Sequence, residues 1–109
     1  MAWTVIIAYF LGGVFFANAI PHFVSGLMGR PFQSPFAKPP FEGLSSSTVN
    51  VLWGAFNLLV VYLLIYKVGD FNAHNTAHAL TLGSGSLAAS VLLARKMGRF
   101  YGGNSPTSN

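Results

Sequence analysis

The residues most able to do chemistry are histidines, and two of them stand four positions apart. At this spacing His74 and His78 share one face of a helix, an arrangement that suits two metal or haem ligands. No further ligand accompanies them, because the chain has no cysteine and His22 is expected on the order of 20 Å away. We therefore expect no cofactor. His74 and His78 are the metal candidates, and an ordinary first helical turn capped by Asn72 or Asn75 is the simpler interpretation.

The acidic residues do not indicate catalysis. Glu42 and Asp70 are the only two in the chain, and an apolar run separates them, so they cannot act as paired carboxylates. The sequence also contains no serine–histidine–aspartate set and no phosphate-binding loop. We expect that the chain is not an enzyme.

These residues are set in a very apolar sequence. Only 7% of the 109 residues are charged, compared with about 25% in an ordinary soluble domain, and 52% are hydrophobic. A soluble domain of this size needs more polar residues to cover its surface. The net charge of +4 sits at the ends of apolar runs, which is typical of membrane proteins and not of nucleic-acid binders.

Three apolar segments predict an all-α integral membrane bundle of three transmembrane helices. They cover about residues 3–28, 48–66 and 77–97, and each can cross a hydrocarbon core of ~30 Å at ~1.5 Å per residue. Residues 1–98 then form a single transmembrane domain, followed by a short polar C-terminal tail at 99–109. A cleaved signal peptide is the alternative for the first segment, and a helix on the membrane surface is the alternative for the third.

Basic residues set the expected orientation. Five of them follow the first helix or end the third: Arg30, Lys38, Arg95, Lys96 and Arg99. Three spans bring these two regions to the same side of the membrane, with Lys67 alone on the other side. The positive-inside rule then predicts that the N-terminus faces outward and the C-terminus inward.

Polar residues inside the first two helices are expected to meet near the inner face. Asn50, Trp53 and Asn57 share one side of the second helix, at the depth of Asn18 and His22 in the first. We predict one intramembrane polar cluster of these five, with His22 bonded to a carbonyl freed by Pro21. Its role is structural, fixing how the helices meet at about 0.6 kcal/mol per hydrogen bond, or it is a ligand site.

Glycines are expected where helices cross closely, because small residues let two backbones approach each other. The candidates lie in all three helices: Gly12, Gly13, Gly54, Gly83 and Gly85.

The loop after the first helix carries three phenylalanines, each directly after a proline. Phe32, Phe36 and Phe41 lie in a stretch that its prolines keep from being helical. We expect a stiff, extended segment of about eighteen residues, long for a connection in a compact protein. It either caps the inner end of the bundle or forms a docking strip for a partner protein.

Two stretches carry a family resemblance. The sequences ANAIPHFVSGLMGRPFQSPFAKPP and NVLWGAFNLL resemble a family of small bacterial integral membrane proteins of unknown function, over roughly residues 11–64. The resemblance implies a bacterial cytoplasmic (inner) membrane and carries no activity.

The function expected is that of a small polytopic membrane protein without catalysis, an accessory or structural subunit of a larger complex. Its partners are then the lipid bilayer and a membrane protein or a second copy, with no nucleic acid. The alternative is a homo-oligomeric small transporter or channel. A metal or haem carrier that uses His74 and His78 is the third possibility.

Overall fold

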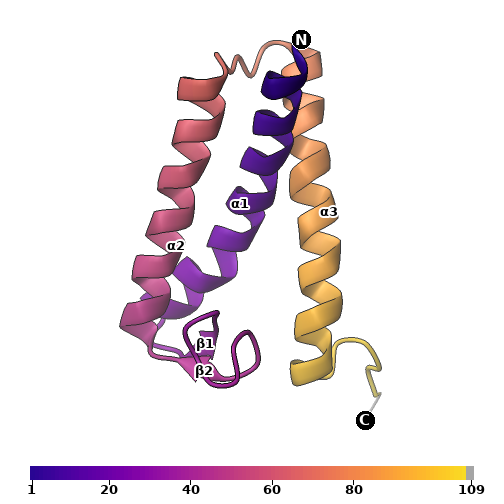
Figure 1. The fold of residues 1–109 in the computed structure, drawn as a ribbon. Helices are drawn as coiled ribbons and strands as arrows, with labels where there is room; N and C mark the ends of the chain where they lie inside the picture. Colours follow the sequence, from indigo (N-terminus) through magenta and orange to yellow (C-terminus); the bar gives the residue numbers. More distant parts are fainter. Residues whose placement is uncertain (108–109) are drawn as a thin grey trace.

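The computed structural model describes residues 1–107 and confirms a bundle of three long helices (Figure 1). Each helix is long and apolar enough to cross a membrane, and the longest dimension of the molecule is 46 Å, close to the ~40–45 Å thickness of a bilayer with its headgroups. The chain is therefore a multi-pass membrane protein. In order, its elements are α1 (Trp3–Leu27), β1 (Phe32–Gln33), β2 (Leu44–Ser45), α2 (Ser47–Tyr62) with a π-helical extension (Leu63–Val68), and α3 (Thr76–Tyr101).

The helix ends differ from the predicted ones by a few residues, and local chemistry explains where they fall. Ser46 caps α2 by accepting a bond from the Val49 N–H, at 3.2 Å. Asn75 caps α3 in the same way, and Gly102 ends it in a left-handed conformation with φ of 81°. The predicted tail at 99–109 therefore begins with three helical residues, and its positions 108–109 lie outside the described part.

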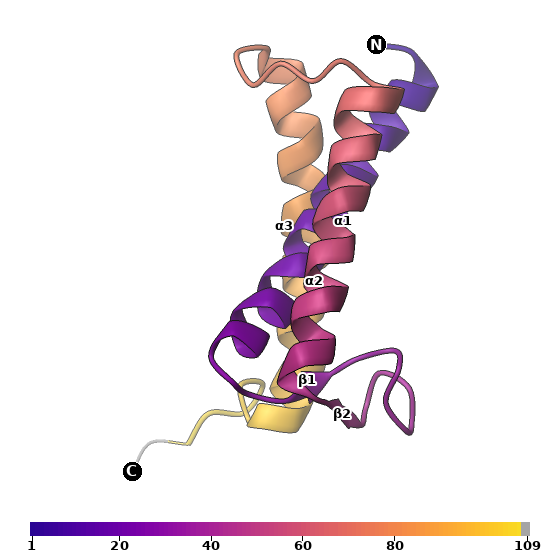
Figure 2. The ribbon, with the colours of Figure 1, turned by 90° about the vertical axis from the view of Figure 1, so that its left-hand side faces the viewer.

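α1 is the central helix of the bundle. It runs antiparallel to α2 and parallel to α3 and packs along both (Figures 1 and 2), whereas the two outer helices lie apart (Figure 1). Pro21 is accommodated inside α1, which continues to Leu27. The loop between α1 and α2 and the end of α3 lie at one end of the bundle, and the N-terminus and the 69–75 loop lie at the other.

Glycines mark the places where α1 meets its neighbours most closely. A Cβ atom added at Gly85 would lie 1.9 Å from the Phe10 carbonyl oxygen, and one added at Gly13 would lie 2.0 Å from that of Leu82. At the α1–α2 contact, a Cβ at Gly54 would lie 2.9 Å from the Phe23 backbone nitrogen. Gly83 does not belong to this set, because it faces away from α1 and a Cβ there meets nothing within 4 Å.

Tyr9 holds together the end of the bundle that carries the N-terminus. Its side chain is buried, and its hydroxyl accepts a bond from the Asp70 backbone N–H at 3.0 Å. The ring packs edge-on against Phe71, with centroids 5.3 Å apart, and lies 4.8 Å from the ring of His78. One side chain of α1 thus fixes both the 69–75 loop and the start of α3.

We expect Tyr9→Phe to lower the free energy of unfolding by about 1 kcal/mol, because the Asp70 N–H loses its acceptor while the ring contacts remain. Thermal unfolding of the purified protein in detergent would measure this. Tyr62→Phe is the matched control, since that tyrosine is exposed on α2 and its change should have little effect. Equal effects of the two substitutions would show that the Tyr9 hydroxyl does not hold the loop.

Candidate functional site

The candidate site lies at the end of the bundle where the long loop meets the helices, and Asn50 is at its centre. This side chain is fully buried at 0% exposure. Its Nδ2 lies 3.2 Å from the carbonyl oxygens of Phe32 and Ser45 and 3.0 Å from that of Ser46, so its two N–H groups donate to three acceptors and one of them is shared. These bonds tie the first turn of α2 to both short strands of the loop.

His22 of α1 completes the environment of Asn50. Its Nδ1 lies 2.7 Å from Asn50 Oδ1. Because the Asn50 amide nitrogen already faces carbonyl oxygens, Oδ1 must be the acceptor, and we assign the proton to His22 Nδ1. The expected bond from His22 to a carbonyl near Pro21 is therefore wrong, since the imidazole bonds α2 instead.

A second hydrogen-bonded pair, of two amide side chains, joins the same two helices nearer their middle. Asn18 Nδ2 donates to Asn57 Oδ1 at 3.1 Å, and Asn57 Nδ2 donates to the Trp53 carbonyl at 2.8 Å. Asn57 is fully buried. The two pairs together cross-link α1 and α2 within the apolar part of the bundle, where a lone amide would be costly.

Trp53 lies between the loop and the two hydrogen-bonded pairs, His22–Asn50 and Asn18–Asn57. Its ring packs near His22 at a centroid distance of 6.4 Å, and Phe36 of the loop meets it edge-on at 5.1 Å. Its Nε1 is buried and has no hydrogen-bond partner among residues 1–107. The structure thus brings together all five residues predicted to cluster, and Trp53 contributes a donor that the other four leave unpaired.

The long loop is compact and not extended as its prolines predicted. β1 and β2 pair antiparallel, with Phe32 opposite Ser45, and the chain between them turns back on itself. Ser34 is buried at the centre of this turn. Its carbonyl accepts from the N–H of Phe41 at 2.8 Å, and its hydroxyl bonds that of Ser45. Local side-chain bonds of this kind let a proline-rich segment fold without long strands.

The three loop phenylalanines contact different helices. Phe32 packs edge-on against His22 and stacks on Tyr101 at the end of α3, with centroids 5.4 and 6.3 Å away. Phe36 packs on Trp53 of α2, and Phe41 receives the ammonium of Lys96 at 4.8 Å from its ring centroid. Phe36 and Phe41 are still 63% and 53% exposed. These contacts favour the capping role for the loop, and docking of a partner stays a prediction.

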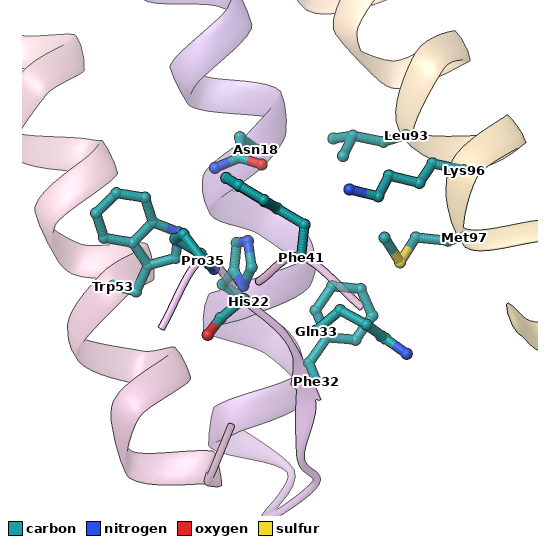
Figure 3. A pocket seen from close by; sticks show the side chains of 11 residues that line it. Asn18, His22, Phe32, Gln33, Pro35, Phe41, Trp53, Leu93, Lys96 and Met97 are labelled. Carbon is teal, nitrogen blue, oxygen red and sulfur yellow. The ribbon is translucent and has the colours of Figure 1, made fainter. Parts of the chain in front are cut away.

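A small cavity of about 70 Å³ opens among these elements. Asn18, His22 and Trp53 line it from α1 and α2, whereas Leu93, Lys96 and Met97 point into it from α3 (Figure 3). Loop residues on both sides of Ser34 close its remaining wall. The cavity is thus bounded by all three helices and the loop, with polar groups on two sides.

Lys96, Gln33 and Ser34 are the polar cavity residues that the sequence did not predict as site residues. The sequence indicates Lys96 only as a basic residue that sets the membrane orientation. It lies seven residues after the buried Ala89, so the two share one face of α3. Gln33 is buried and accepts a bond from the Tyr101 hydroxyl at 3.0 Å. Nothing in the sequence around Gln33 or Ser34 marks a buried loop residue.

The other candidates lie at the opposite end of the bundle from His22. His74 is exposed, and His78 Nδ1 accepts from the Asn72 N–H at 3.1 Å, which occupies that nitrogen. Within residues 1–107, no group of three histidine, cysteine, aspartate or glutamate side chains is placed to hold a metal ion. His74 lies in the turn before the Asn75 cap, outside α3, so the prediction that the two histidines share one helix face is wrong.

The cavity presents polar groups that can bind a ligand. It contains a histidine, two amides, an indole N–H and a lysine ammonium, but its lining includes no carboxylate or nucleophile–base pair. Comparison of the chain with protein-family models, with curated proteins and with solved structures finds no match.

Proposed function

We propose that this chain is a non-catalytic accessory subunit of a larger membrane protein complex. The observation that carries the proposal is the exposure of α3. Only 11% of its apolar window is buried within the chain, compared with 33% for α1 and 28% for α2. α3 is also the least apolar of the three helices. A helix that is rich in small polar residues and little buried within its own chain favours packing against another helix.

The outward face of α3 has the spacing of a helix–helix contact. Exposed residues recur along it at alternating steps of four and three: Leu80, Ser84, Leu87, Val91 and Ala94. This spacing suits a neighbour crossing at about +20°. Gly83 lies beside this row with open space in front of it, so a second backbone has room to approach. These features support the proposal that a transmembrane helix of another protein packs on this face.

The acidic residues support the absence of catalysis. Glu42 lies at the loop end of the bundle, where its carboxylate is 4.0 Å from the Arg99 guanidinium and both side chains are exposed. Asp70 lies at the opposite end, next to Tyr9. Two carboxylates so far apart cannot share one reaction site.

The proposed location is the inner membrane of a bacterium, with the N-terminus outside and the C-terminus inside. The support is the charge at the two ends of the bundle. The end that holds the long loop and the end of α3 (Figure 1) carries five of the six basic residues, and basic residues gather on the cytoplasmic side.

The test is purification of the tagged chain from its own membrane in a mild detergent. We expect a membrane protein to copurify at a fixed stoichiometry, and we expect Gly83→Leu to abolish this, because the leucine fills the open face of α3 without touching α1. Ala55→Leu, on the exposed side of α2, is the matched control and should retain the partner. Recovery of the chain only with itself, together with solute flux in liposomes, would overturn the proposal in favour of a homo-oligomeric transporter or channel.

A further inference from the structure

One buried hydrogen-bond donor in the cavity wall has no acceptor within the described part of the chain. The buried Trp53 Nε1–H has no partner among residues 1–107. A buried donor without a partner is destabilising, so a ligand that brings an oxygen acceptor would be stabilised here.

Lys96 adds a positive charge at the same place. Its side chain is half-buried and reaches from α3 toward the cavity, with the ammonium beside the ring of Phe41 (Figure 3). Within the described residues the carboxylate of Glu42 approaches Arg99 and not Lys96. A partly desolvated ammonium without a carboxylate favours an anion.

An apolar groove continues from the cavity along the bundle. It has a volume of about 220 Å³ and shares Asn18 and Leu93 with the cavity. Its other walls are Val14 and Phe15 of α1 and Ala89 and Leu92 of α3. These residues lie nearer the middle of their helices than His22 and Lys96 do, so the groove runs toward the centre of the membrane.

We propose that the cavity and groove bind one anionic phospholipid, with its phosphate beside Lys96 and Trp53 and an acyl chain in the groove between α1 and α3. The cavity has about the volume of two liquid waters, which suits a phosphate group and excludes a large headgroup. Basic pockets between transmembrane helices bind the headgroups of such lipids. The inference stands apart from the accessory role of the outward face of α3, because it uses the opposite face of that helix.

The experiment is native mass spectrometry on the purified chain after delipidation and addition of phosphatidylglycerol or phosphatidylcholine. We expect one phosphatidylglycerol per chain, and at least about tenfold weaker binding of phosphatidylcholine, which corresponds to one charge-assisted contact. Lys96→Gln should remove this preference. Arg95→Gln removes the same charge from the adjacent, exposed position and should weaken binding by no more than about fivefold, the effect of a basic residue near a membrane surface.

A second variant tests the site without changing the charge. Leu93→Trp fills the junction of cavity and groove and should abolish retention of the lipid, with circular dichroism confirming that the helices form. Equal losses in Lys96→Gln and Arg95→Gln would overturn the proposal in favour of diffuse surface attraction. Retention of inorganic phosphate alone, at the same stoichiometry and with the same sensitivity to Lys96→Gln, would overturn the lipid as the source of the anion.

Discussion

Gly85→Ala is expected to lower the free energy of unfolding by about 2 kcal/mol, the cost of forcing a methyl group into a packed contact. The added Cβ would lie 1.9 Å from the Phe10 carbonyl oxygen, and backbone atoms cannot move aside as a side-chain tip can. α1 and α3 would have to separate where they cross. Because α3 contacts little else in the chain, we expect it to detach before α1 and α2 come apart.

Gly83→Ala is the control for this experiment, two residues away on the same helix. A methyl group there meets nothing within 4 Å, so stability should change by less than about 0.5 kcal/mol. Ser86→Ala removes the hydrogen bond from Ser86 Oγ to the Gly13 carbonyl and should cost about 0.6 kcal/mol. Unfolding in mixed detergent and sodium dodecyl sulfate measures all three. If Gly85→Ala and Gly83→Ala behave alike, close packing is not what holds α3.

Asn50→Leu should cost about 3 kcal/mol and release the long loop. The substitution keeps a similar volume but leaves the His22 Nδ1–H and the Phe32 and Ser45 carbonyl oxygens without their partner, at about 1–3 kcal/mol for each group that stays buried. The loop should then open locally to avoid this cost. Limited digestion with chymotrypsin after Phe36 and Phe41 reports its release, and thermal unfolding reports the stability.

Asn50→Asp separates two explanations of that result. A carboxylate can still accept from His22 Nδ1–H, but it places an oxygen against the carbonyl oxygens of Phe32, Ser45 and Ser46. If Asn50 anchors the loop, Asn50→Asp should release it as Asn50→Leu does. Digestion at the wild-type rate would show that only the bond to His22 matters. Thr48→Ala, on the same turn and exposed, should leave both measurements unchanged.

The polar cluster was predictable because its members obey a local rule. Asn50, Trp53 and Asn57 share a helix face by their spacing alone, and an antiparallel α1 brings Asn18 and His22 to the same depth. Which groups bond was not predictable, because hydrogen bonds depend on side-chain geometry. The sequence predicted a backbone carbonyl as the hydrogen-bond partner of His22, whereas in the structure its partner is the Asn50 side-chain amide.

The loop shows where local rules fail. Its prolines exclude a helix, as predicted, but its compact turn depends on Ser34 meeting Ser45 and on Asn50 reaching the Phe32 carbonyl from α2. These contacts join residues that are distant in the sequence. The same holds for Lys96. Its position at a helix end predicted only the membrane orientation, because its place beside Phe41 depends on both α3 and the folded loop.

The sequence by itself determined the three spans and the depth of the polar residues in the first two, because transfer into lipid and helical periodicity are properties of short segments. Tertiary structure decided that α1 is central, that Gly85 touches it while Gly83 does not, and that a cavity forms beside Lys96. The reason is physical: two glycines on one helix are equivalent in sequence, and only the rotation of that helix against its neighbour makes one a contact and leaves the other exposed.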